Sequence, residues 1–210
     1  MTPSDSSIAR DGAMNSADVA AHKTVLRAGL LAARNALTDS ERNDATSRIG
    51  MHVLNWVSRG GVKTLAVYSP MRGEPDLQDT WRAVAAAGIE LALPVVVAID
   101  APLNFVAWEP GQAMVRDGFG VKIPALPRRP VTPQAILIPC LGITPQRVRL
   151  GYGGGFYDRT LAALTMATAV GIAFDCCRTD FKAQAHDIAL HTVITESGIA
   201  YNYYCDNANR

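Results

Sequence analysis

Short apolar runs that lack polar alternation limit the fold of this chain more than any other feature of its sequence. Such runs are typical of strands buried on both faces, and helical segments separate most of them. This order indicates an α/β domain in which helices cover both sides of a mainly parallel sheet, a three-layer α/β/α arrangement. The runs cover residues 62–68, 89–97, 104–108, 135–143, 169–174 and 192–195.

Helical patterns precede the first run and fill the main gaps between the others. The first pattern begins at Asp18, and Thr38 and Glu41 have the spacing of a capping box for the second. A chain of 210 residues is long enough to bury a substantial core in one domain. We therefore expect a single domain over residues 18–201, with loose tails at residues 1–17 and 202–210.

Composition gives no support to nucleic-acid or membrane binding. The formal net charge is +1, the sequence has no strongly basic block, and no uncharged apolar run approaches the length of a membrane span. The four cysteines form neither a CxxC motif nor a zinc-ligand spacing, so reduced thiols in a cytoplasm are expected. Cys176 and Cys177 are adjacent, and a redox switch at this pair stays open.

A glycine-rich loop lies between the apolar run at residues 135–143 and a helical segment. It reads RLGYGGGFYDR, and a strand, a glycine loop and a helix in this order are typical of phosphate-binding loops. The loop matches neither the Walker motif nor the dinucleotide fingerprint. Arg147, Arg149 and Arg159 favour an anion there, and Asp158 favours a cation such as Mg²⁺ beside it. On these residues alone, a phosphate site and a structural loop both remain open.

Further charged residues lie where the strand ends should gather. Ligands of parallel α/β sheets bind beyond the carboxyl ends of the strands, and loops near such ends contain Glu74 and Asp187. Each is either a solvated loop acid or part of a shared cleft. On the first helix, Lys23, Arg27 and Arg34 form a stripe beside the apolar face. They are either cations at the edge of the core or cations held over a neighbouring cleft.

The glycine loop and three other segments resemble the 5-formyltetrahydrofolate cyclo-ligases, also called 5,10-methenyltetrahydrofolate synthetases. LGYGGGFYDR, preceded by LIPCLGIT, is similar to the signature of that family. KTVLRAGLLAARNAL, VYSPMRGEPD and AHDIALHTVITESG are similar to its opening helix, its folate-side loop and its closing segment. The resemblance runs over residues 23–198 and covers most of the chain.

This resemblance implies a Rossmann-like fold of the kind found in CoA transferases, and an ATP- and Mg²⁺-dependent C–N ligase. The family converts 5-formyltetrahydrofolate to 5,10-methenyltetrahydrofolate and releases ADP and phosphate, by phosphorylation of the formyl oxygen. A cytoplasmic monomer is expected, acting on a folate with or without a polyglutamate tail. The alternative is a folate-binding or regulatory homologue without turnover, and a sugar-phosphate or acyl-carrier activity on the same architecture is a third hypothesis.

The resemblance also implies roles for individual residues. Lys23, Arg149 and Asp158 are expected to be catalytic, and Asp158 and Asp187 are expected to bind Mg²⁺. The expected folate-binding residues are Arg27, Ser69, Glu74, Tyr152, Gly153, Gly154, Gly155 and Phe156. The expected ATP-binding residues are Lys23, Thr24, Val25, Leu26, Arg27, Arg149, Leu150, Gly151, Tyr152, Gly153, Gly154, Gly155, Phe156 and Tyr157.

Three positions depart from the pattern of the family. His191 stands where a second acid is usual, Thr144 stands where an aspartate is common, and Ile123 replaces a glutamate before a proline. None of these departures removes an expected phosphate or metal ligand, but they leave room for an altered affinity.

Overall fold

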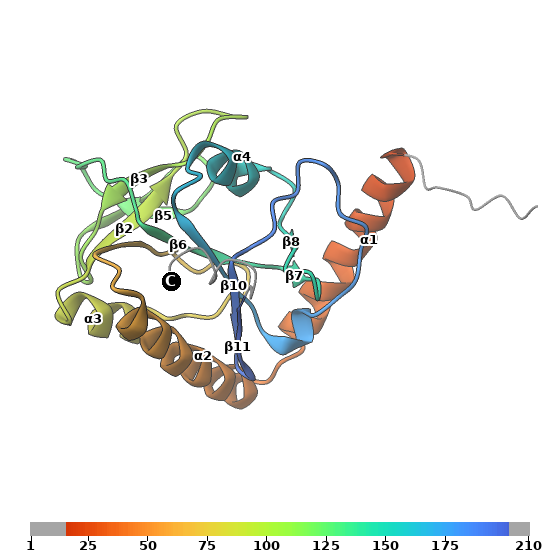
Figure 1. Cartoon of the computed structure of the whole chain (residues 1–210), viewed down its shortest axis with the longest axis horizontal. Helices are drawn as coiled ribbons and strands as arrows, with labels where there is room; N and C mark the ends of the chain where they lie inside the picture. The colour runs from red at the N-terminus through yellow and green to blue at the C-terminus, as the bar shows by residue number, and fades with distance from the viewer. Residues whose placement is uncertain (1–15, 202–210) are drawn as a thin grey trace, which may run out of the picture.

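The computed structural model describes residues 16–201, and a seven-stranded sheet runs through its centre (Figure 1). In order across the sheet, its strands are β11 (Gly198–Tyr201), β10 (Thr192–Thr195), β9 (Thr168–Ile172), β6 (Ala135–Pro139), β1 (Thr64–Ala66), β2 (Glu90–Val95) and β3 (Asn104–Ala107). The inner strands pair in parallel, whereas β11 and β3 pair antiparallel at the two edges. The mainly parallel sheet is confirmed.

Helices cover both faces of this sheet, so the three-layer arrangement is also confirmed. Helices α2 (Asp39–Gly60) and α3 (Gln78–Ala86) lie on one side, and α4 (Phe156–Ala163) lies on the other (Figure 1). Helix α1 (Ser16–Asn35) lies beyond one end of the sheet, next to the short 3-10 helix η1 (Asp175–Cys177).

The capping box predicted for α2 is present. The Thr38 hydroxyl oxygen accepts a hydrogen bond from the Glu41 backbone N–H at 3.3 Å, and the Thr38 backbone N–H donates to Glu41 Oε2 at 2.9 Å. The apolar stripe of the helix, which includes Ile49 and Val53, is buried in the main core. Gly61 ends the helix in the left-handed conformation, with φ of 61°. The local signals and the packing of α2 therefore agree.

The apolar run at residues 135–143 forms two strands instead of the one expected. The chain leaves the main sheet after Pro139, and β7 (Gly142–Ile143) pairs with β8 (Arg149–Leu150) in a separate small sheet. Close packing against α1 accompanies the change, because a Cβ on Gly142 would stand 2.7 Å from Leu30 Cδ1. The split matters for function because β8 leads directly into the glycine loop.

The strand order creates a topological switch point between β1 and β6. From β1 the chain proceeds to β2 and β3 on one side, and it later returns to β6, β9 and β10 on the other side. Loops that leave the carboxyl ends of two such strands diverge, and the crevice between them is the usual ligand site of an open α/β sheet. The sheet topology therefore places the predicted site at this edge.

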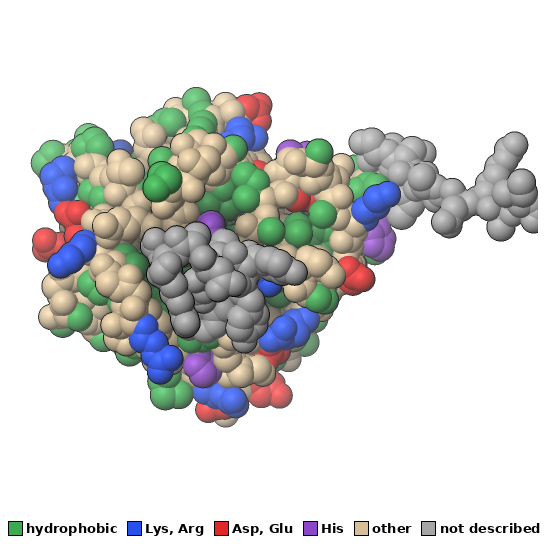
Figure 2. Space-filling model, in the orientation of Figure 1, with side chains coloured by type: hydrophobic (Ala, Val, Ile, Leu, Met, Phe, Trp, Pro, Cys, Tyr) green, Lys and Arg blue, Asp and Glu red, His purple; other side chains and the backbone are tan. Residues whose placement is uncertain are grey.

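Charges of both signs are interspersed over the face of the molecule seen in Figure 2. Within residues 16–201, no helix combines the length and the apolar character needed to cross a membrane. Helix α1 begins at Ser16, two residues before the expected start of the domain. The remaining predicted tail residues, 1–15 and 202–210, lie outside the described part of the chain.

The packing around Gly171 in β9 predicts a stability effect. A Cβ there would stand 2.5 Å from Leu190 Cδ1 and 3.1 Å from Cys140 Sγ. We predict that Gly171→Ala lowers the free energy of unfolding by about 1–3 kcal/mol, because buried neighbours must shift. The control Gly29→Ala, in α1 with no atom within 4 Å of the new Cβ, should raise it by about 0.5–1 kcal/mol. Chemical denaturation measures both effects, and an unchanged Gly171→Ala midpoint would contradict this packing.

Candidate active site

A cleft of about 380 Å³ opens at the carboxyl edge of the sheet. The loop after β1, the glycine loop after β8, a segment at residues 184–187 and one face of α1 all contribute to its lining. The predicted site residues that line it are Lys23, Arg27, Ser69, Glu74, Arg149, Gly151, Tyr152, Gly153, Gly154, Gly155, Phe156, Tyr157, Asp158 and Asp187. Residues far apart in the sequence thus meet in one place.

Four residues predicted to bind ATP do not line the cleft. The Thr24 hydroxyl donates to a backbone carbonyl of its own helix at 3.0 Å, and the Val25 side chain is 71% exposed. Leu26 and Leu150 pack in a small apolar cluster that joins α1 to β8. These two leucines hold the backbone on either side of the cleft. A direct nucleotide contact by any of the four stays a prediction.

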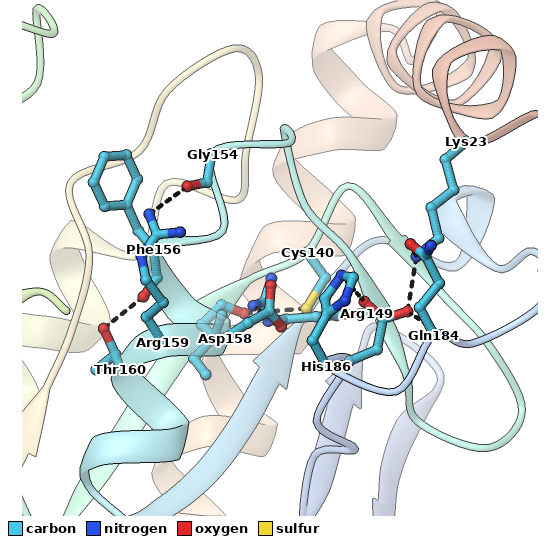
Figure 3. Close-up of polar contacts among 12 residues, drawn as sticks. Lys23, Cys140, Arg149, Gly154, Phe156, Asp158, Arg159, Thr160, Gln184 and His186 are labelled. Carbon is cyan, nitrogen blue, oxygen red and sulfur yellow. Dashed lines mark hydrogen bonds and ion pairs between the residues drawn. The ribbon is translucent and has the colours of Figure 1, made fainter. Parts of the chain in front are cut away.

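Of the three arginines beside the glycine loop, only Arg149 lines the cleft. Arg147 Nε instead donates to the Leu190 carbonyl at 3.1 Å, which ties the turn before β8 to the segment before β10. Arg159 Nη2 donates to the Gly154 carbonyl at 2.7 Å, so α4 braces the glycine loop from outside (Figure 3). The expected anion cradle therefore contains one of these three arginines.

The glycine loop requires glycine at two of its positions. The φ angles of Gly153 and Gly155 are 98° and 64°, in the left-handed region that side chains disfavour. Gly155 is the N-cap of α4, and residues of the first turn of that helix line the cleft. Arg27 Nε donates to the Gly151 carbonyl at 2.9 Å, and a Cβ on Gly153 would stand 3.6 Å from Arg27 Cζ. The loop therefore bends closely around Arg27.

Two ion pairs in the cleft join predicted phosphate-binding cations to predicted metal ligands. Lys23 Nζ lies 2.7 Å from Asp187 Oδ2, and Arg149 Nη2 lies 2.6 Å from Asp158 Oδ1 (Figure 3). Both cations are buried. Burial alone would raise the pKa of Asp187, but hydrogen bonds from Lys23 and from the Gln184 backbone N–H outweigh it and lower the pKa. Asp187 is therefore ionised at neutral pH.

Asp158 and Asp187 are the candidate Mg²⁺ ligands in the cleft. Within residues 16–201, no three His, Cys, Asp or Glu side chains gather into a group that could enclose a metal. Magnesium at nucleotide sites is usually bound through one or two carboxylates together with phosphate oxygens and water. Asp158 and Asp187 supply hard oxygen donors of this kind on the lining of the cleft.

Glu74 is a buried acid in this cleft, with 4% of its surface exposed. Its Oε2 accepts a hydrogen bond from the Met71 backbone N–H at 3.0 Å, and its Oε1 accepts one from the Tyr152 hydroxyl at 2.9 Å. Burial raises the pKa of Glu74 to about 7, although these hydrogen bonds and the nearby Arg34 and Arg72 charges oppose the shift. Glu74 is therefore a cleft residue that titrates near neutral pH, and the solvated-acid alternative is wrong.

Arg34 lies close to the cleft. The sequence had left open whether this arginine lies at the edge of the core or beside a cleft. Its side chain is fully buried, and Nη2 donates to the Tyr152 hydroxyl at 2.5 Å and to the Arg72 carbonyl at 2.8 Å. The stripe of cations on α1 was the correct signal, because Lys23 and Arg27 on the same stripe line the cleft.

Two lining residues carry no signal in the sequence. Phe119 lies in the turn between β4 (Met114–Arg116) and β5 (Lys122–Pro124), and its ring meets Phe156 edge-on at a centroid distance of 5.8 Å. Gln184 Oε1 accepts a hydrogen bond from Lys23 Nζ at 3.0 Å. Both are single residues in loops, so neither belongs to a motif or a periodic pattern.

The three departures from the family pattern lie outside the cleft. Thr144 Oγ1 accepts a hydrogen bond from the Val148 N–H at 3.1 Å, and His191 Nδ1 accepts one from the Ala169 N–H at 3.0 Å. Ile123 packs in a small apolar cluster with Val95 of β2 and Val106 of β3. These side chains therefore serve local structure.

The adjacent cysteines give no support to a redox switch. Both are free, and burial raises the pKa of each thiol, that of Cys177 to about 12. Redox-active cysteines have a lowered pKa and an accessible thiolate. Cys176 and Cys177 are instead protonated at neutral pH.

The model of the 5-formyltetrahydrofolate cyclo-ligase family matches residues 19–196. Two curated relatives carry the name 5-formyltetrahydrofolate cyclo-ligase. The one from Mycolicibacterium smegmatis is 30% identical over 187 residues, which cover 82% of this chain and 93% of the relative. The one from Escherichia coli K12 is 29% identical over 174 residues, which cover 79% and 96%.

Solved structures with the same fold are 5,10-methenyltetrahydrofolate synthetases. The protein from Mycoplasma pneumoniae aligns with a TM-score of 0.70 at 25% identity, over 83% of this chain and 98% of that chain. The protein from Aquifex aeolicus aligns with a TM-score of 0.74 at 25% identity, over 85% of this chain and 92% of that chain.

The conformation of Gly153 predicts a local effect on binding of ATP, the expected ligand of the loop. We predict that Gly153→Ala weakens ATP binding about tenfold or more, because a side chain at this φ strains the loop around Arg27 by about 1–2 kcal/mol. Calorimetric titration with ATP measures the effect. Gly61→Ala, which also places a side chain at a positive φ, here 61°, but outside the cleft, is the control and should leave ATP affinity unchanged. Equal ATP affinity in both variants would show that the glycine loop has a structural role and does not bind ATP.

Proposed function

Because the chain belongs to the 5-formyltetrahydrofolate cyclo-ligase family, we propose that it converts 5-formyltetrahydrofolate to 5,10-methenyltetrahydrofolate in a reaction that consumes ATP and requires Mg²⁺. It is an enzyme of the ligase class, like its curated relatives. The observation that carries the ATP-dependent mechanism is the composition of the cleft. The glycine loop, two buried cations with their aspartates and the buried acid Glu74 share one lining.

The chemistry explains why such a cleft is needed. A formyl oxygen is a poor leaving group, so it first attacks the terminal phosphorus of ATP, and ADP departs. The second folate nitrogen then attacks the formyl carbon and loses its proton, and inorganic phosphate leaves with the former formyl oxygen. Phosphoryl transfer depends on positioning and on neutralisation of charge more than on covalent help from the protein.

Lys23 and Arg149 are the residues we assign to the phosphates, together with the N–H groups at the start of α4. Both cations bind carboxylates in the described structure. A Mg²⁺ held by Asp158 and Asp187 would supply further charge neutralisation on the phosphates. Lys23 and Arg149 could then exchange carboxylate oxygens for phosphate oxygens, so that every charge keeps a partner.

Glu74, Arg27, Ser69 and Tyr152 are the residues we assign to the folate. A carboxylate has two acceptor oxygens, which match the amino group and the ring N–H of a pterin. Glu74 is buried on the lining, and the aromatic rings of Tyr152 and Phe156 lie on the same cleft. The pterin is therefore assigned to the Glu74 end and the nucleotide to the Lys23 end.

We extend the proposal to folates that carry a polyglutamate tail. A second hollow adjoins the cleft and shares Ser69, Met71, Arg72 and Val121 with it. Three cations line this hollow against one acid, Asp76, so it suits a chain of carboxylates. The cations are Arg72, Arg116 and Lys122.

We also propose that the enzyme acts as a cytoplasmic monomer. One chain contains every residue assigned to the cleft, which supports a monomer. Cys140, Cys176 and Cys177 are free, as expected in a reducing compartment. A homologue that binds folate without turnover is less well supported, because the three departures from the family pattern lie outside the cleft.

The metal assignment predicts a selective loss of turnover. In a spectrophotometric assay of the methenyl product, the wild-type chain should turn over only with ATP and Mg²⁺ present. Asp158→Asn should reduce turnover about 100-fold, because it removes a carboxylate ligand of the Mg²⁺ that neutralises the phosphates. Because Asp158 also pairs with the buried Arg149, chemical denaturation measures its effect on the free energy of unfolding separately. Asp175→Asn is the control, since Asp175 also pairs with an arginine but lies outside the cleft. Normal turnover of Asp158→Asn at limiting Mg²⁺ would refute the assignment.

The titration of Glu74 predicts a pH-dependent folate affinity. Its pKa of about 7 means that the carboxylate forms as the pH rises, so the folate Michaelis constant should fall between about pH 6 and pH 8. Glu74→Gln should raise that constant about 10- to 100-fold, the effect of losing a charged hydrogen bond of about 1.5–3 kcal/mol, and should abolish its pH dependence. Asp79→Asn, which changes an exposed acid of α3 outside both the cleft and the adjoining hollow, should do neither. An equal loss of ATP affinity in Glu74→Gln would contradict the placement.

A further inference from the structure

A buried network connects helix α1 to the acid of the folate pocket. Arg34 Nη2 donates to the Tyr152 hydroxyl at 2.5 Å, and that hydroxyl donates to Glu74 Oε1 at 2.9 Å. We propose that Arg34 is a positioning residue, which acts through the Tyr152 phenol to hold Glu74 in one orientation and to favour its ionised form. The inference rests on the proposed function of the cleft and adds to it a residue that does not line the cleft.

Stability alone does not explain Arg34 at this position. Its side chain is fully buried, yet Nε and Nη1 have no hydrogen-bond partner among the described residues. Removing a guanidinium from water is costly, and an incompletely satisfied buried ion is a poor source of stability. An apolar side chain of similar volume would fill the space at a lower desolvation penalty. The presence of arginine therefore points to a role for its donors and its charge.

The chemistry of the three groups gives the network a single direction. Arginine has only donors, so the Tyr152 oxygen must accept from Arg34, and its one proton is then committed to Glu74. A proton on Glu74 Oε1 would oppose the phenol proton and break this contact. The other carboxylate oxygen, Oε2, also accepts a hydrogen bond, from the Met71 backbone N–H. Both contacts therefore favour the carboxylate and leave acceptor capacity on each oxygen for a ligand.

The remaining groups that face Glu74 do not replace this network. Arg72, from the same loop, also lowers the pKa of Glu74, but its side chain is exposed and water screens its charge. The other titratable neighbours have raised pKa values, mainly because they are buried, so they are uncharged at neutral pH. They are Tyr68 after β1, Cys140 after β6, Tyr152 in the glycine loop and Tyr157 in α4.

Direct titration of Glu74 in the ligand-free full-length chain tests the proposal. The sequence has five glutamates, so NMR of protein labelled at the glutamate carboxyl carbons gives few signals, and Glu74→Gln identifies the signal of Glu74. Tyr152→Phe and Arg34→Met should each raise the pKa of Glu74 by about one unit, because each removes a contribution that favours the carboxylate. The double variant should raise it by less than the sum, because both changes interrupt one network.

Arg42→Met is the matched control. Arg42 donates to the Gly73 carbonyl at 2.9 Å and to the Arg34 carbonyl at 2.8 Å, so it supports the same loop without touching Tyr152 or Glu74. It should leave the pKa of Glu74 unchanged. If the pKa rises as much in Arg42→Met as in Arg34→Met, general loosening of the loop explains the effect and the proposal is wrong.

Two other results would overturn the proposal. The first is an unchanged pKa of Glu74 in Tyr152→Phe. This test can be made even if Arg34→Met fails to fold. The second is an undiminished effect of Arg34→Met in the Tyr152→Phe background, because Arg34 would then act independently of the phenol. A wild-type chain that forms no methenyl product would contradict the proposed function, whereas the titration in ligand-free protein would still decide the role of Arg34.

Discussion

The divergence of the chain on either side of β1 is the constraint on which the rest of the structure depends. The chain runs from β1 to β2 in one direction and returns to β6 in the other, so two neighbouring parallel strands send their loops apart. Glu74 arrives at the crevice from the first loop. The chain after β6 leaves the sheet to form β7 and β8, and the glycine loop that follows β8 lies in the same crevice. Helix α1 completes the cleft with Lys23 and Arg27.

Charge balance is the second feature that the structure depends on. Lys23 and Arg149 are buried, and each is held by an aspartate that also lines the cleft. Buried cations without partners would destabilise the fold, so the two aspartates stabilise the protein by pairing with them. The same carboxylates are suitable Mg²⁺ ligands, and the same cations are suitable phosphate ligands. The groups that neutralise one another in the free protein are thus those that the proposed reaction needs.

The sequence predicted the layers of the fold, the inner strands and most of the lining of the cleft. Those predictions rest on local patterns, such as the apolar runs, the capping box of α2 and the glycine loop. The split after Pro139 was missed because it depends on packing of Gly142 against α1, which is a contact between distant segments. Arg147 and Arg159 were misplaced for a similar reason, since the tertiary structure sets which backbone carbonyl groups their side chains bind. Phe119 and Gln184 lie in loops without any periodic pattern.

The central claim is that this cleft activates the formyl oxygen by phosphoryl transfer, and the fate of that oxygen tests it most directly. The experiment is turnover of 5-formyltetrahydrofolate that carries a heavy isotope at the formyl oxygen, with ATP and Mg²⁺, followed by mass analysis of the released phosphate. The account predicts one labelled oxygen in each inorganic phosphate formed with the methenyl product. Unlabelled phosphate, with the heavy oxygen recovered in water, would show that ring closure proceeds without phosphorylation of the formyl group and would contradict the account.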